Sequence, residues 1–190
     1  KHITSGKFQF IGLTKIKKID SIVDIGAGFA RLTPSYIFRA KKIVLTDPSS
    51  KLLSLAKKRF PEKKVDVVKS SLEKLPDKLR NKSFDLVIMI RVLHHIKNLD
   101  KAFSTVSKIL KNNGYFILEF ANKRHGKAFA REFMKGNFTF LHDILPLEIS
   151  TKPTSKQILP FLNYHPDVIK EKLKEHNFDV LEMRSVSNIR

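Results

Sequence analysis

The 190-residue sequence contains no cysteine. It can therefore form no disulfide, no thiolate zinc site and no cysteine nucleophile. No apolar run approaches the roughly 20 residues of a membrane-spanning helix, and the opening KHITSGKFQF lacks the apolar block of a signal peptide. We expect a cytoplasmic location as the default. Because the chain opens on Lys1, we also expect that the natural N-terminus lies upstream.

Acidic residues are few, 18 against 37 basic ones, which gives a formal net charge of +19. Such a charge raises the prospect of a nucleic-acid or anionic-membrane partner. Lysines occur in almost every segment and far outnumber arginines, whereas a dedicated phosphate-binding face would use more arginine. We therefore favour a general lysine bias, and a nucleic-acid partner stays open without being favoured.

Short apolar runs alternate with helical patterns along most of the chain. The pattern predicts helices at 49–60, 100–114 with Asp100 as the N-cap, and 165–178 with Pro166 in the first turn. This alternation is typical of right-handed βαβ crossovers in an α/β fold, an open and mostly parallel sheet with helices on both faces. The expected strands are 21–26, 42–47, 64–70, 84–90, 115–121 and 179–187.

Residues 122–163 interrupt this rhythm with basic and aromatic residues and several prolines. We interpret them as a lid-like helical insertion within one domain covering 1–190. Phenylalanines of the insertion either line an acceptor pocket or form the insertion's own core.

The stretch SIVDIGAGFARL places a glycine loop directly after the first strand. A dinucleotide-binding G-x-G-x-x-G would need glycine where Arg31 stands, and the phosphate-binding G-x-x-x-x-G-K is absent. The pattern is D-x-G-x-G-x-A from Asp24 to Ala30, followed 21 residues after Gly26 by Asp47, at the end of the second strand. A carboxylate there can accept hydrogen bonds from ribose hydroxyls; the alternative is a helix-capping turn residue before Pro48.

These motifs resemble those of class I S-adenosylmethionine-dependent methyltransferases, in the small-molecule, type 11-like branch. The resemblance is close over residues 21–121 and includes SSLEKLP, FDLVIMIRVLHHI and KILKNNGYFIL. It implies S-adenosyl-L-methionine as cofactor. Alanine replaces the last glycine of the first motif, and we expect Ala30 to keep a negative φ. The implied cofactor-binding residues are Asp24, Gly26, Ala27, Gly28, Asp47, Pro48, Ser71, Leu72 and Arg91.

Two histidines, His94 and His95, stand in the turn after the fourth strand, where the resemblance places the substrate. Either one is a candidate general base, because its pKa lies near neutrality; the alternative is a packing or capping role. Tyr164 and His165 are weaker candidates for facing the acceptor. His142 beside Asp143 lacks further ligands at suitable spacing, so we expect no metal site.

The sequence thus predicts methyl transfer to a small or lipid-like molecule by in-line displacement. Two alternatives stay open: an RNA methyltransferase, which the charge supports, and a non-catalytic relative that keeps the fold as a binding module. Serine at position 71, where the family usually has an acid, supports the second alternative. So does the apparent lack of the family's seventh strand. The acceptor and the oligomeric state are not readable from the sequence.

Overall fold

The computed structural model describes residues 19–61, 63–79, 84–123, 132–136, 143–148 and 161–184. The described residues divide into two compact units. The first lies within residues 1–90, 104–118 and 182–190, and the second within 91–103 and 119–181. Among the described residues, no helix has the length and apolar character needed to cross a membrane.

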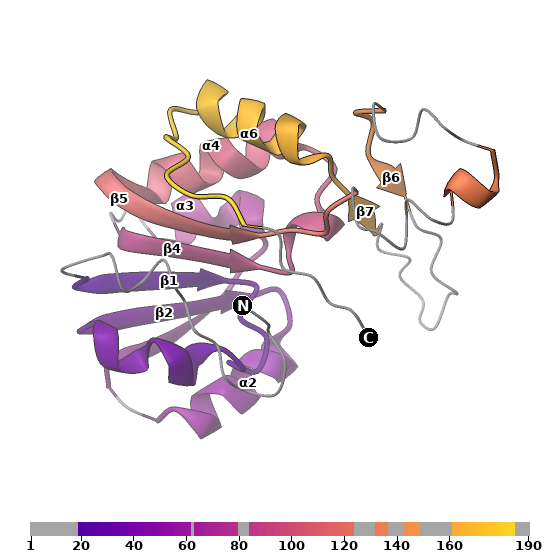
Figure 1. Ribbon diagram of the computed structural model, residues 1–190. Coiled ribbons are helices and arrows are strands. Elements are labelled where there is room, and N and C mark those ends of the chain that lie inside the picture. The colour runs from indigo at the N-terminus through magenta and orange to yellow at the C-terminus, as the bar shows by residue number, and fades with distance from the viewer. Residues whose placement is uncertain are drawn as a thin grey trace. The chain divides into compact units, whose positions relative to one another are not determined.

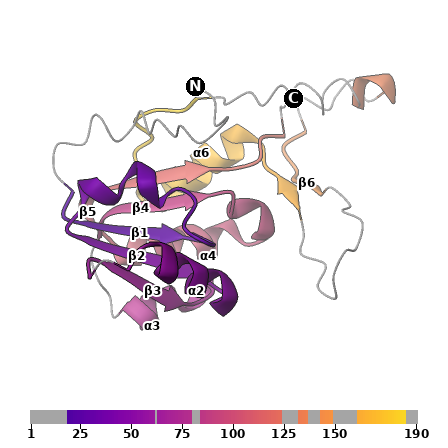
Figure 2. The ribbon, with the colours of Figure 1, turned by 90° about the horizontal axis from the view of Figure 1, so that it is seen from below.

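The first unit contains a five-stranded sheet in the order β3-β2-β1-β4-β5 (Figures 1 and 2). β1 runs parallel to both of its neighbours, with Val23 opposite Val44 of β2 and Val87 of β4. The expected α/β fold with a mostly parallel sheet is confirmed. The strands are β1 Ser21–Ile25, β2 Lys42–Asp47, β3 Val65–Lys69, β4 Phe84–Ile90 and β5 Leu110–Glu119.

Helical segments connect the strands, and those of the first unit pack on its sheet (Figure 1). Ser49 caps α2 by accepting a hydrogen bond from the Leu52 amide, as the sequence predicted. Pro166 occupies the first turn of α6, also as predicted. The segments are η1 Thr33–Ser35, η2 Ile37–Arg39, α2 Ser50–Arg59, η3 Leu72–Lys74, α3 Leu75–Leu79, η4 Leu93–His95, α4 Leu99–Ile109 and α6 Pro166–Glu175.

One hydrophobic core lies between the sheet and the layer formed by η1, η2 and α2. Alternate strand residues such as Ile22, Ile43 and Leu86 point into it, because side chains alternate between the faces of a strand. Tyr36 and Leu53 close this core from the helical layer. The η1–η2 segment and α2 therefore share one face of the sheet, as Figure 1 shows.

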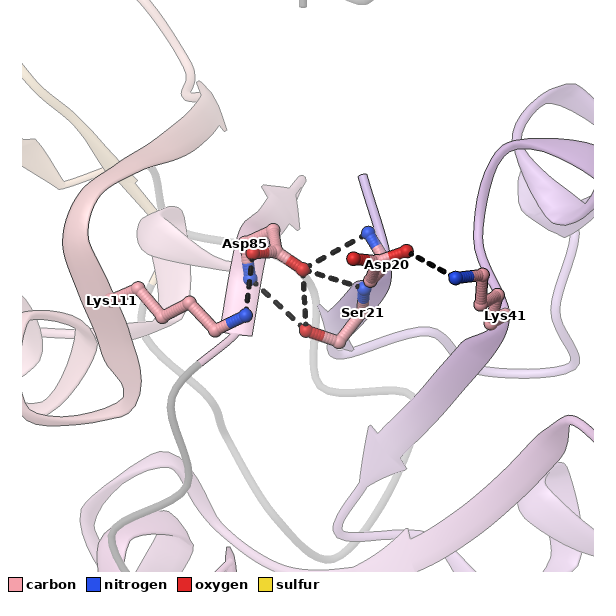
Figure 3. Close-up of polar contacts among 5 residues, drawn as sticks. All are labelled: Asp20, Ser21, Lys41, Asp85 and Lys111. Carbon is pink, nitrogen blue, oxygen red and sulfur yellow. Dashed lines mark hydrogen bonds and ion pairs between the residues drawn. The ribbon is translucent and has the colours of Figure 1, made fainter. Parts of the chain in front are cut away.

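A carboxylate fastens the amino ends of β1 and β4 together (Figure 3). One oxygen of Asp85 accepts hydrogen bonds from the Asp20 and Ser21 amides and from the Ser21 hydroxyl. Its other oxygen lies 2.6 Å from Lys111 Nζ. These donors outweigh the burial that would raise the pKa of Asp85, and lower it to about 2. This cluster lies at the amino ends of the strands, whereas the glycine loop follows the carboxyl end of β1.

Three local expectations are corrected by the structure. Asn98, and not Asp100, caps α4, with its side-chain oxygen 2.8 Å from the Lys101 amide. β5 begins at Leu110 instead of residue 115, and it includes Asn113, whose φ of 62° is left-handed. Residues 179–184 form no strand, and the rest of the expected sixth strand lies outside the described residues.

The second unit holds the described part of the insertion. A two-residue strand, β6 Leu147–Glu148, pairs antiparallel with β7 Leu162–Asn163, and residues 132–134 are helical. Lys123 is buried and its ammonium binds the Asp143 carboxylate at 2.7 Å and two backbone carbonyls. This lysine ties residues 143–145 to the chain that follows β5. Residues 124–131, 137–142 and 149–160 of the insertion, His142 included, lie outside the described residues.

Candidate functional site

The glycine loop directly after β1 has three residues in the left-handed region. Gly26 has φ 70°, Gly28 φ 57° and Ala30 φ 62°. The expectation of a negative φ at Ala30 is therefore wrong: this alanine adopts a left-handed conformation that glycine adopts more readily. Its buried methyl group packs in the core, and the backbone carries a strain of about 1 kcal/mol.

Asp47 holds the glycine loop against the start of α2. Its Oδ2 accepts a hydrogen bond from the Gly28 amide at 3.1 Å, and its Oδ1 accepts one from the Ser49 amide at 2.8 Å. The carboxylate is buried, and Pro48 stands exposed between the two contacts. Asp47 is thus a turn residue before Pro48, as one of the two sequence interpretations predicted, whereas the N-cap of α2 is Ser49.

Asp24 is a buried carboxylate near the carboxyl end of β1, 3% exposed. Its Oδ2 accepts a hydrogen bond from the Tyr36 hydroxyl at 2.5 Å, and that hydroxyl lies 3.1 Å from Thr33 Oγ1. Burial raises the pKa of Asp24 to about 7, which the Tyr36 hydrogen bond opposes and the Asp47 charge reinforces. Tyr36 and Thr33 were not predicted as site residues, because nothing in the run TPSY points to a carboxylate 12 positions before Tyr36.

Ser71 and Leu72 follow β3 and are half-buried. The amide of the preceding Ser70 donates to the Asp47 carbonyl at 3.2 Å. The ends of β2 and β3 are thereby linked. The first unit thus gathers Asp24, the glycine loop, Asp47 and the start of η3 at the carboxyl edge of neighbouring parallel strands, where ligands bind in folds of this class.

Arg91 lies in the second unit and already has an acidic partner. Its Nε is 3.3 Å from Glu119 Oε1, and its amide donates to the Glu119 carbonyl. Its φ of 58° makes it a left-handed residue that is not glycine, and such strain concentrates at functional positions.

His94 and His95 form η4 with Leu93, as neighbours whose ring centroids are 3.9 Å apart. The His94 ring also packs on Phe161, with centroids 4.4 Å apart. Burial, together with the nearby positive charges of His95 and Arg91, lowers the pKa of His94 to about 4. His94 is therefore neutral at physiological pH, and His95 is the more exposed of the two.

Tyr164 and His165 have clear structural contacts inside the second unit. The buried Tyr164 hydroxyl donates to the Ile96 carbonyl directly after η4, and burial raises the pKa of Tyr164 to about 12. His165 caps α6 by accepting a hydrogen bond from the Asp167 amide. Tyr164 thus fastens β7 to the turn that carries both candidate histidines. The part of the chain that the structure describes contains no group of His, Asp and Glu suited to holding a metal ion.

Comparison with known proteins finds related sequences and related structures. The profile of a family described as "Methyltransferase domain" matches residues 23–118. The probable S-adenosylmethionine-dependent methyltransferase CRG1 of Saccharomyces cerevisiae is 35% identical over 104 residues, covering 53% of this chain but only 35% of CRG1. The ubiquinone/menaquinone biosynthesis C-methyltransferase UbiE of Campylobacter jejuni is 27% identical over 190 residues, covering 90% of this chain and 76% of UbiE.

Among solved structures, an S-adenosylmethionine-dependent methyltransferase from Methanosarcina mazei aligns with a TM-score of 0.69 at 16% identity. The alignment covers 90% of this chain and 85% of that protein. At this identity the likeness shows that the two proteins share a fold.

Proposed function

This chain belongs to the S-adenosylmethionine-dependent methyltransferases, and we propose that it transfers a methyl group to a small, lipid-like acceptor. When bound, the cofactor would supply an electrophilic methyl carbon on a sulfonium, whose C–S bond breaks to release a neutral thioether as the acceptor's nucleophilic atom bonds to that carbon in line. The protein's contribution is then to bind, to orient and to exclude water.

The residues at the carboxyl edge of the first unit fit this cofactor. Asp24 is a buried carboxylate beside a neutral hydroxyl, so a cationic ammonium group would favour its ionised form. A Cβ added to Gly28 would meet only Leu52, at 3.9 Å, so the loop backbone stays open to close approach. We assign the amino-acid end of the cofactor to Asp24 and to the loop of Gly26, Ala27 and Gly28.

Asp47 has the capacity to bind the ribose. A carboxylate offers about four acceptor sites, and the Gly28 and Ser49 amides occupy two of them. The remaining lone pairs suit two adjacent hydroxyl groups. We assign Asp47 and Pro48 to the ribose and Ser71 and Leu72 to the adenine.

The observation that carries the cofactor assignment is the hydrogen bond from the Gly28 amide to Asp47. It joins the two motifs that the sequence places 19 residues apart, and it fixes the glycine loop beside a buried carboxylate. In a dinucleotide-binding loop, by contrast, the glycines allow the backbone to approach a pyrophosphate group.

The second unit supplies the candidates for handling the acceptor. We propose His95 as the candidate general base, because the lowered pKa of His94 makes that ring a weak proton acceptor. His94 and Phe161 then offer an aromatic surface. Arg91, paired with Glu119, is proposed to contact the cofactor carboxylate. A lipid-like acceptor agrees with the UbiE relatives, which match 90% of this chain, and a cytoplasmic location belongs to the same proposal.

Cofactor binding is tested by calorimetry with S-adenosylhomocysteine. The wild-type chain should bind it, and Asp47→Asn should weaken binding about tenfold or more, because hydrogen bonds to a charged acceptor are lost. Asp66→Ala, at an exposed position of β3, is the matched control and should bind like the wild type. Absence of binding by the wild-type chain would contradict the cofactor assignment and favour the non-catalytic alternative.

The acceptor class is tested by transfer of labelled methyl from S-adenosylmethionine. Polyprenyl quinols that lack a ring methyl group are offered in one reaction and mixed-sequence RNA in another. Label in the solvent-extracted quinol supports the proposal. Label found only in the RNA would show that the proposed acceptor is wrong while leaving the cofactor assignment intact.

A further inference from the structure

Basic residues strongly outnumber acidic ones in the stretch that contains the first helical layer. Residues 25–61 contain a single acidic residue, Asp47, and that carboxylate is buried against the glycine loop. The same stretch contains eight basic residues: Arg31, Arg39, Lys41, Lys42, Lys51, Lys57, Lys58 and Arg59. This layer is therefore far more one-sided in charge than the chain as a whole.

The outward side of α2 carries part of this charge. Leu53 and Ala56 face the core, so the exposed residues Lys51, Leu55 and Lys58 lie on the opposite side at helical spacing. Lys57 is not part of this stripe, because its ammonium donates to the Val65 carbonyl at 2.7 Å.

Large apolar side chains project among these cations. Phe38 in η2 is 70% exposed and Leu55 in α2 is 48% exposed. The Arg39 guanidinium lies 5.7 Å from the centre of the Phe38 ring. Phe38 and Arg39 in η2 and Lys51, Leu55 and Lys58 in α2 belong to the helical layer that closes this core from one face of the sheet. We call these five residues the basic outer face.

We infer that the basic outer face docks on anionic lipid surfaces. Cations attract the headgroups, and exposed apolar side chains enter the boundary between headgroups and acyl chains. The exposed Leu55 between two lysines and the exposed Phe38 ring both add to such binding. Lysine as a point charge also suits a fluid layer of headgroups, which does not require the fixed fork of arginine.

This inference concerns binding alone and needs neither the cofactor nor the proposed acceptor. It is tested by sedimenting the full chain with vesicles of phosphatidylcholine, with and without phosphatidylglycerol. The wild type should bind only the vesicles that contain phosphatidylglycerol. Lys51→Gln with Lys58→Gln should weaken that binding about 25-fold, at about fivefold for each lost cation.

A matched pair with the same change in net charge is Lys78→Gln with Lys108→Gln. Both lysines are exposed, and they lie in α3 and α4, which contribute no residue to the core beneath the basic outer face. This control should bind within about twofold of the wild type, since charges facing away from the membrane are screened. Phe38→Ser should lower vesicle binding about tenfold while leaving its salt dependence unchanged.

Two results would overturn the inference. Equal loss of vesicle binding in the two lysine pairs would show that total charge, and not this face, determines binding. Tight binding of mixed-sequence RNA, lost in the Lys51/Lys58 pair, by a chain that ignores anionic vesicles would identify a nucleic-acid interface instead. Circular dichroism melts of each variant confirm that the fold is retained.

Discussion

Replacing Asp24 with asparagine is expected to stabilise the protein in the absence of ligand. Asparagine keeps an oxygen that can accept the Tyr36 hydroxyl hydrogen bond, and it removes a charge from a site that is 3% exposed. The usual cost of losing a buried hydrogen-bond acceptor is thereby avoided. The substitution therefore raises the unfolding free energy mainly by removing the cost of ionising a buried carboxyl group.

The size of the effect follows from the pKa of Asp24, which is raised from 3.8 to about 7. In the folded chain the group keeps its proton over a range where the unfolded chain has lost it. Stability from Asp24 is therefore complete below about pH 4 and is lost as the pH rises toward 7. At about 1.4 kcal/mol for each pH unit, the loss approaches about 4 kcal/mol, and relaxation around the charge makes about 2–4 kcal/mol the expected range.

The assay is urea unfolding followed by circular dichroism, for the wild type and Asp24→Asn, at pH values from 4 to 8. We expect equal unfolding free energies near pH 4 and an advantage of about 2–4 kcal/mol for the variant at pH 8. A difference that does not vary with pH, or a variant that is less stable at pH 8, would refute the reasoning. S-adenosylhomocysteine should narrow the gap at pH 8, because its ammonium stabilises the wild-type carboxylate alone.

Three further outcomes follow from other contacts. Asp85→Asn should lower the unfolding free energy by about 1–2 kcal/mol at pH 7. Because the pKa of Asp85 is lowered to about 2, the wild type loses this advantage as the pH falls from 4 to 2. Urea titrations at pH 7 and at pH 2 measure both values. Gly114→Ala should lower the unfolding free energy by about 2–3 kcal/mol in the same assay, because the added Cβ would lie 2.8–2.9 Å from its neighbours. Gly136→Ala should lower it by only about 1 kcal/mol, since its Cβ would meet nothing within 4 Å and only the left-handed backbone is unfavourable. Tyr164→Phe should cost about 1 kcal/mol by leaving the Ile96 carbonyl without this donor, and should speed amide hydrogen exchange in the turn after β4.

The repeating part of the fold was predictable from sequence because its causes are local. Apolar runs that stop at Gly26, Asp47 and Arg91 indicated β1, β2 and β4 nearly residue for residue, because strands buried on both faces appear in sequence as continuous apolar runs. Ser49 and Pro166 marked the starts of their helices for equally local reasons. The positions of the glycine loop and Asp47 were also predictable, because each directly follows or ends a local apolar run.

The errors arose where distant contacts decide the conformation. Ala30 takes a left-handed φ because the loop is held at both sides, by Asp47 on Gly28 and by the Ala27 amide on the Thr46 carbonyl. The preference of a single residue cannot reveal that constraint. Asn98 is the N-cap of α4, because the Asp100 carboxylate instead forms an ion pair with the Lys172 ammonium of α6 at 3.0 Å. The buried Lys123 has acceptors about 20 positions away, which no periodicity indicates.

The two acids near the ends of β1 and β2 have different environments, and on this difference we propose different roles for them. Asp47 accepts two backbone amides, so its side chain is already held in place without a ligand and can act as a fixed support for the loop. Asp24 has one hydroxyl donor and a raised pKa, so a bound cation would further stabilise its charged form. Cofactor affinity should therefore rise with pH up to about 7 through Asp24 and lose that dependence in Asp24→Asn, whereas Asp47→Asn should weaken binding at every pH.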